Sequence, residues 1–183
     1  MSYKARSLRR KLDGNRAPGL KTRLWILDSR YIEEYPARAT IARIDDSIVL
    51  VDSNTYPDAK WHQLEVLIDT PGTEIKQEGE AGAKHYSGEL SMQYDGTNEE
   101  ALEALGNLSG GIELIVGWEG KDGSIRIAGE RHNGCFMEFS ENTGKKSGDF
   151  IGYEIKVKLP TVGKPFPYYK GDFTPIEEYT PPT

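Results

Sequence analysis

The residues that could support catalysis or metal binding are one cysteine, three histidines and a few carboxylates. Cys135 follows His132 by three residues, and on a strand this spacing does not readily bring a thiolate and its base together. Because Cys135 alternates with Met137 and Phe139, we predict a small, buried, apolar side chain. Glu130 shares a strand face with His132, but two ligands do not make a metal site.

Other chemistry-bearing patterns are equally incomplete. His62 and His85 flank predicted strands and have no obvious acidic partner in sequence. Glu99 and Glu100 suit the first turn of a helix, where the helix dipole favours negative charge. The glycines between 117 and 123 precede no helix, and the chain has no phosphate-binding Gly-Lys-Ser or Gly-Lys-Thr. Without a convergent acid, base and nucleophile, we expect no enzyme, no metal and no cofactor.

Length and composition indicate one polar domain. The chain has 183 residues and 20.5 kDa, with 37% hydrophobic and 28% charged residues and a mean hydropathy of −0.61. It has no apolar run long enough to span a membrane, and its basic start lacks the apolar stretch of a secretory signal. We therefore expect synthesis in a reducing cytoplasm and no membrane partner. A single cysteine excludes an internal disulfide.

Charge is distributed unevenly along the chain. Residues 1–30 hold nine Lys or Arg against two Asp, whereas the remainder holds 14 basic and 27 acidic residues, for a net charge of −6. We predict a basic extended arm over residues 1–34, which docks on the acidic surface of a neighbouring copy. The alternative is a small β-barrel that binds nucleic acid through this arm. Only Tyr3 and Trp25 interleave with its cations, and the acidic body would repel a polyanion.

Alternation of apolar and polar residues predicts most of the strands. We expect a hairpin of residues 39–44 and 47–51, then a strand over 61–68. Residues 70–84 are rich in Gly, Glu and Lys and predict a long exposed loop or a projecting hairpin. Further strands are predicted around 90–94, 112–118, 125–128, 135–139 and 153–159.

One amphipathic helix is predicted over residues 97–109. Thr97 and Glu100 form a capping box, and the apolar stripe comprises Ala101, Leu102, Leu105 and Leu108. The residues Gly-Lys-Asp-Gly at 120–123 predict a hairpin turn, and residues 144–149 predict another turn between strands.

These elements predict a mainly β fold, an antiparallel β-sandwich or barrel with a helix across one opening. We place this domain at residues 35–162, including the long loop 70–86. The Pro- and Tyr-rich tail, residues 163–183, is not expected to join a sheet interior. It should lie extended on a neighbouring surface or remain mobile.

The order of elements between about residues 60 and 160 resembles the tail tube and related neck or tail ring proteins of tailed bacteriophages, including phages infecting Bacteroidetes. The similarity is carried by Tyr86, Gly88 and Glu89, by the capped helix at 97–99, by the turn at 120–123 and by residues 143–153. The resemblance implies a tail tube-like sandwich that forms rings of six or twelve copies around a DNA channel. It also implies that the long loop 70–86 contacts a neighbouring subunit and that helix 97–109 packs outside the sandwich.

The expected function is that of a virion structural protein that forms a ring in the phage neck or tail. Its partners would be copies of itself, neighbouring neck or tail proteins and DNA passing through without sequence-specific contact. Tube subunit, head-tail connector and terminator remain open. A carbohydrate-binding sandwich using Trp61, Trp118 or Tyr94 is a further alternative. The candidate subunit-interface residues are Arg9, Arg10, Lys11, Glu74, Lys76, Lys84, Phe166, Tyr168 and Tyr169.

Overall fold

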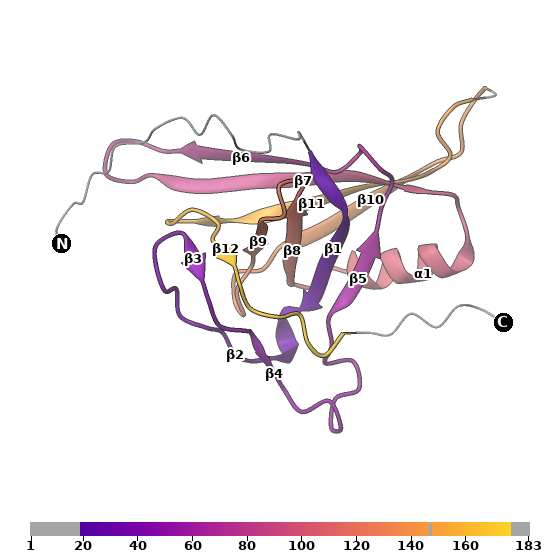
Figure 1. Cartoon of the computed structure of the whole chain (residues 1–183). Helices are drawn as coiled ribbons and strands as arrows, with labels where there is room; N and C mark the ends of the chain where they lie inside the picture. Colours follow the sequence, from indigo (N-terminus) through magenta and orange to yellow (C-terminus); the bar gives the residue numbers. More distant parts are fainter. Residues whose placement is uncertain (1–18, 147, 177–183) are drawn as a thin grey trace.

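The computed structural model describes residues 19–146 and 148–176. These residues form strands with one α-helix and one short 3-10 helix, Ser29–Tyr31 (Figure 1). The elements are β1 (Leu20–Asp28), β2 (Ile32–Glu34), β3 (Arg43–Ile44), β4 (Val49–Leu50), β5 (His62–Glu65), β6 (Gly72–Glu78), β7 (His85–Asp95), α1 (Glu99–Leu108), β8 (Leu114–Gly120), β9 (Ile125–Ala128), β10 (Phe136–Asn142), β11 (Gly152–Val162) and β12 (Tyr168–Tyr169).

The strands build two main sheets and confirm the predicted fold class, a mainly β sandwich with one helix. The six-stranded sheet has the order β3-β12-β9-β8-β1-β5, and the four-stranded sheet has the order β10-β11-β7-β6. A small third sheet pairs β2 with β4. Neighbouring strands are antiparallel except β12 and β3, which are parallel. Figure 1 shows the strands of the two main sheets crossing one another.

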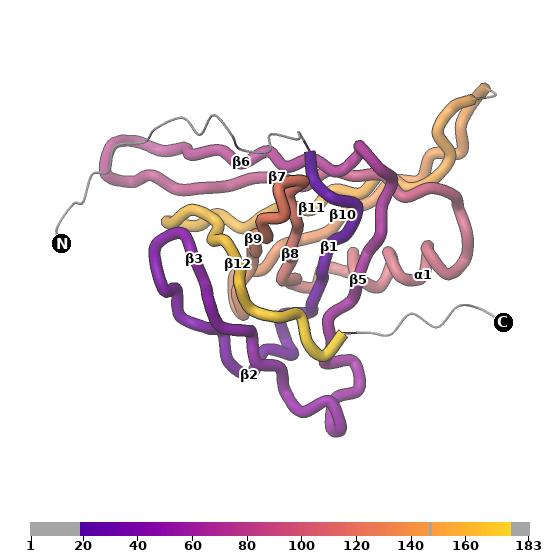
Figure 2. The backbone as a smooth tube through the Cα atoms, in the orientation of Figure 1, coloured from indigo at the N-terminus to yellow at the C-terminus, as the bar shows by residue number. Residues whose placement is uncertain are grey.

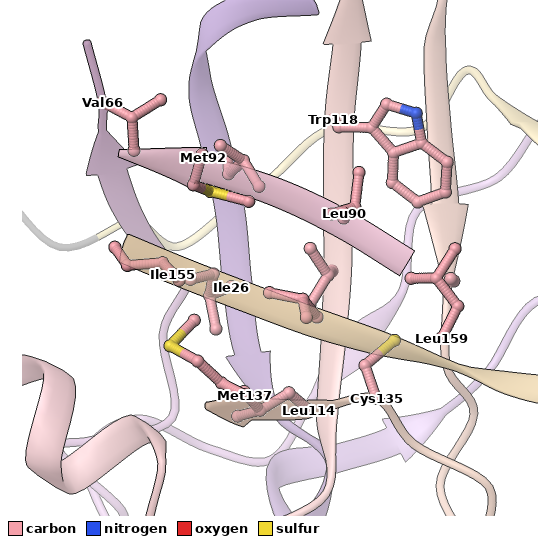
Figure 3. Packing of buried hydrophobic residues seen from close by; sticks show 14 of the residues in the cluster. Ile26, Val66, Leu90, Met92, Leu114, Trp118, Cys135, Met137, Ile155 and Leu159 are labelled. Carbon is pink, nitrogen blue, oxygen red and sulfur yellow. The ribbon is translucent and has the colours of Figure 1, made fainter. Parts of the chain in front are cut away.

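The main core lies between these two sheets. Ile26, Leu114 and Trp118 of the six-stranded sheet pack with Leu90 and Ile155 of the four-stranded sheet (Figure 3). Alternate residues of β11 are buried, as expected for the strand predicted around 153–159: Tyr153, Ile155, Val157 and Leu159. The alternation of buried and exposed residues along most of β11 follows from one face in the core and one face in solvent.

A second core lies on the other face of the six-stranded sheet. It contains Trp25 and Leu27 of β1 and Ile115 of β8, covered by Ile32 and Trp61 from the connections outside the sheet. Most of β8, and β1 from Leu24 onward, are therefore buried on both faces. The prediction of an extended arm is wrong for residues 19–34, because β1 lies inside the sheet. Residues 1–18 lie outside the described part of the chain.

The predicted hairpin of residues 39–51 is also wrong. β3 pairs in parallel with β12, and β4 pairs with β2, so the two short strands belong to different sheets. Ile44 and Ile48 are nevertheless buried, because both pack into the second core. Burial of these two side chains, rather than pairing between adjacent strands, sets the path of this segment.

The excursion at residues 70–86 is a projecting hairpin rather than a loop. β6 and β7 pair from Gly72 and Ser91 out to Glu78 and His85, and residues 79–84 form the connection. Figure 2 shows this hairpin and the β10–β11 hairpin extending from the body. The predicted turn at 120–123 is present, and the Gly120 N–H donates to the Ser124 carbonyl (2.8 Å). At the second predicted turn, the Asp149 carboxylate accepts from the Lys145 N–H (2.8 Å).

Helix α1 is present, but its cap differs from the prediction. Asn98, not Thr97, is the N-cap residue, and its side-chain oxygen accepts from the Ala101 N–H at 2.7 Å. Ala101 and Leu105 pack into the main core, whereas Leu102 is 46% exposed. The helix covers one end of the sandwich (Figure 1). Among the described residues, no helix has the length and apolarity needed to cross a membrane.

The tail prediction is wrong for residues 163–176. β12 is inserted between β3 and β9, so this segment does join a sheet interior. Phe173 stacks on Trp25 with ring centroids 4.4 Å apart and meets Trp61 edge-on at 4.9 Å. The aromatic residues of the segment thus fold onto their own domain, and residues 177–183 lie outside the described part.

Candidate functional site

The residues considered for catalysis and metal binding are dispersed or buried. Cys135 is fully buried in the main core, as predicted, and burial raises the pKa of its thiol far above the ordinary value. His85 lies across the hairpin from Glu78, with 3.8 Å between Nε2 and Oε2. Within residues 19–146 and 148–176, no three His, Cys, Asp or Glu side chains gather in a group that could hold a metal ion.

Three of the predicted interface residues lie on the projecting hairpin. Glu74 and Lys76 are exposed on β6 and form an ion pair with 3.0 Å between Oε1 and Nζ. The hydrogen bond to Glu74 raises the pKa of Lys76. Lys84 is exposed in the connection between β6 and β7. Arg9, Arg10 and Lys11 lie outside the described residues.

The other three predicted interface residues have different environments. Phe166 is 3% exposed and packs edge-on against Trp118, and Tyr169 is 1% exposed. The Tyr169 hydroxyl accepts from the Ile48 N–H and donates to the Asp172 carbonyl, each at 3.1 Å. Phe166 and Tyr169 are therefore core residues, and their prediction as interface residues is wrong. Tyr168, by contrast, is 42% exposed.

The aromatic residues considered for sugar binding do not form an exposed surface. Trp61 and Trp118 are at most 2% exposed and belong to the second and main cores, respectively. Tyr94 is half-buried and lies beside Tyr153, with ring centroids 6.5 Å apart. A carbohydrate platform built on these side chains is not available in this fold.

The outer face of the four-stranded sheet is a charged surface. Register places its polar side chains on the face opposite the core, and each of its three lysines has a glutamate partner. Lys158 Nζ lies 2.6 Å from Glu138 Oε1, and Lys156 Nζ lies 3.9 Å from Glu89 Oε1. The hydrogen bond to Glu138 raises the pKa of Lys158. The charged members of this surface are Glu74, Lys76, Glu78, Glu89, Asp95, Glu138, Glu154, Lys156 and Lys158, so carboxylates are in excess.

Two edge strands bound this sheet. β6 and β10 each have seven residues, and in the described part of the chain neither has a strand paired to its outer side. Because every pair in the order β10-β11-β7-β6 is antiparallel, β6 and β10 run in opposite directions. Phe136, at the start of β10, is 43% exposed. The sheet thus offers two complementary edges for strand addition.

Sequence reasoning missed one polar site, centred on Arg126. This residue lies on β9 between Ile125 and Ile127, opposite Trp118 on β8 and Tyr168 on β12. A basic residue that alternates with apolar ones on a short strand is a signal for a cation placed between two sheets.

Comparisons with protein-family models, with curated proteins and with solved structures find no match to this chain.

Proposed function

We propose that this chain is a virion structural protein that assembles with copies of itself into a ring in the neck or tail of a bacteriophage. The observation that carries the proposal is the pair of seven-residue edge strands, β6 and β10, which bound one antiparallel sheet on opposite sides. An open edge strand of this length presents unpaired backbone N–H and C=O groups, which can pair with another chain. Natural proteins therefore cover or pair such edges.

Rotational symmetry makes these two edges complementary. Subunits related by rotation about a ring axis keep the same strand direction along that axis, so β10 of one subunit meets β6 of the next. Since β6 and β10 run in opposite directions, each junction is antiparallel and continues the pattern within the subunit. A head-to-tail contact of this kind forms a closed ring when the rotation closes, and then the four-stranded sheet has no unpaired edge.

The charged outer face of the four-stranded sheet suits the wall of a DNA channel. Its lysines are paired with glutamates, for example Lys158 with Glu138, so the remaining charge is negative. A negative wall repels the phosphate backbone and lets DNA pass without adhering. On this proposal, the sheet of the assembled ring turns this face inward and its apolar face outward into each subunit's core.

The projecting elements would connect subunits and rings. The β6–β7 hairpin, which carries Lys84 near its end, would reach a neighbouring subunit, and the basic segment containing Arg9, Arg10 and Lys11 would bind an acidic neighbouring surface. Interfaces of this kind bury more than about 1,000 Å² in stable assemblies.

Light scattering after size-exclusion chromatography tests the proposal. The full chain is expected to elute as a large oligomer, and Phe136→Glu is expected to reduce its mass, because a charge on the β10 edge strand opposes pairing. Leu102→Glu is the control: Leu102 is 46% exposed on α1 and belongs to neither edge strand, so its variant should keep the wild-type mass. A compact monomer at all concentrations, or equal loss of mass in both variants, would contradict the proposal.

The alternative is a nucleic-acid-binding protein that uses the basic segment before Gly19. Tight DNA binding that weakens steeply with salt and disappears when residues 1–18 are deleted would favour this alternative.

A further inference from the structure

A cleft of about 560 Å³ is lined by residues of both main sheets. Its strands β9 and β12 lie on the side of the sandwich opposite α1 (Figure 1). Its lining includes Thr73 and Ile75 of β6, Trp118 of β8, Arg126 of β9 and Tyr168 of β12. The cleft therefore brings side chains of both sheets together at a place where the sandwich is open.

Arg126 is held in this cleft between two aromatic residues. Cross-strand register places it directly between Tyr168 and Trp118 on one row of the six-stranded sheet. Its guanidinium carbon lies 5.1 Å from the centroid of the Tyr168 ring. This stacking fixes the orientation of the planar guanidinium group and leaves its N–H donors free for another partner.

Two buried polar atoms in the cleft have no hydrogen-bond partner among residues 19–146 and 148–176. They are Nε of Arg126 and Oγ1 of Thr73, which come from opposite sheets. Arg126 also forms no ion pair with any carboxylate in the part of the chain that the structure describes. A buried donor without a partner costs about 1 to 3 kcal/mol, and more when it is charged, so native proteins rarely retain one without a reason.

The other charges around the cleft are already engaged. Lys121 Nζ forms an ion pair with Asp69 Oδ1. Asp122 Oδ1 accepts from the Ser124 hydroxyl at 2.7 Å and from the Ser124 N–H at 3.0 Å, and these bonds lower the pKa of Asp122. Neither carboxylate is therefore free to neutralise Arg126 without breaking an existing interaction.

We propose that this cleft is a carboxylate-binding site. The guanidinium of Arg126 would donate to the two oxygens of one carboxylate, and the Thr73 hydroxyl would donate a further hydrogen bond from the facing sheet. A single guanidinium fork matches one planar monoanion. Asp122 lines the cleft and Asp69 pairs with the lining residue Lys121, and these carboxylates disfavour a phosphate dianion or a nucleic acid. The site does not depend on ring formation.

The carboxylate can come from a free small molecule or from a side chain of a second copy. The second source is available on this chain, because Glu78 and Glu80 are exposed at the end of the projecting β6–β7 hairpin. Both sources present the same group to Arg126, so the experiment has separate arms for them.

The test measures the melting temperature of the full chain with increasing N-acetylglutamate α-amide, at constant ionic strength. The probe is expected to raise the melting temperature of the wild type and not that of Arg126→Met. Without probe, Arg126→Met should melt at or above the wild-type temperature, because it removes an unpaired charge. Thr73→Val should require about tenfold more probe for the same shift. Arg131→Met, which removes an exposed arginine outside the cleft, should respond like the wild type.

No response in the wild type, or equal responses in the wild type and Arg126→Met, would overturn the proposal. If Arg126→Met does not fold, Thr73→Val provides the test. If the probe raises the melting temperature of Thr73→Val as much as that of the wild type, the proposal is also overturned. The mass in solution separates the two sources. If a second copy supplies the carboxylate, the probe and the double variant Glu78→Gln/Glu80→Gln both lower the mass. If the ligand is a free carboxylate, neither changes the mass while the thermal response persists.

Discussion

Phe173 anchors the segment after β11 to the second core, and its replacement by alanine is expected to destabilise the whole domain. Its ring stacks on Trp25 at 4.4 Å with 4° between the planes and contacts Trp61 and Tyr169 at 4.9 and 5.1 Å. The ring also occupies the space above Gly117, where an added Cβ would lie 2.8 Å from Phe173 Cζ. Segment and sheet are therefore packed as one unit.

The size of the effect follows from these contacts. Truncating a buried phenylalanine to alanine costs about 3 to 5 kcal/mol, and each aromatic pair adds about 0.5 to 1.5 kcal/mol beyond the area it buries. Because Phe173 is only half-buried, we expect a loss of about 2 to 4 kcal/mol in the free energy of unfolding. For a chain of this length that corresponds to a fall of roughly 5 to 15 °C in melting temperature.

Urea denaturation followed by tryptophan fluorescence measures this loss directly, since Trp25 and Trp61 both touch the ring. Ile68→Ala is the control: Ile68 is 74% exposed and lies outside the β6 and β10 edge strands, so its truncation should change the stability by less than about 0.5 kcal/mol. If Phe173→Ala is no more destabilising than Ile68→Ala, the segment is not part of the folded domain and the reasoning fails.

Two further predictions test the helix cap and the buried thiol. Asn98→Ala should lower the free energy of unfolding by about 0.5 to 2 kcal/mol in denaturant titrations, because the Ala101 N–H loses its acceptor, whereas Thr97→Ala should be nearly neutral. If Thr97→Ala is instead more destabilising than Asn98→Ala, Thr97 is the N-cap residue. Cys135 should react with a thiol-specific disulfide reagent only at the rate of unfolding, because burial raises the pKa of its thiol and excludes the reagent. Complete labelling within seconds under native conditions would show that the cysteine is accessible.

Strands with one wet face were predictable because their own residues carry the pattern. Leu90 and Met92 alternate with polar residues on β7, and Ile155 and Val157 do so on β11, so the inward face follows from the period of two. The two turns were predictable for the same local reason, since Gly120–Gly123 and Asp149 satisfy their own backbone groups.

Elements that depend on distant partners were not predictable in this way. β1 interrupts its apolar run with Lys21 and Arg23, whose side chains lie at the surface and pair with Glu119 and Glu65. These cations gave the strand the composition of an arm, although Leu24–Leu27 is buried on both faces. The uninterrupted run from Leu24 to Leu27 was the signal for a central strand.

The prolines of the last segment predicted that it would stay outside the sheets, but its aromatic residues bring it into the domain. Pro165 and Pro167 cannot donate within a sheet, but Tyr168 and Tyr169 can, and β12 uses only these two residues. Tyr169 is buried in the second core, and Phe173 is partly buried against it, because large aromatic side chains favour burial. Arg126 was missed because its environment is formed by β6 and β12, which are distant from β9 in the sequence.

Negative-stain electron microscopy of the purified full chain tests the central claim most directly. A ring-forming subunit predicts uniform annular particles with six or twelve copies and a central channel, and the Phe136→Glu variant should lack them. Isolated compact particles of one copy, at every concentration tested, would contradict the account.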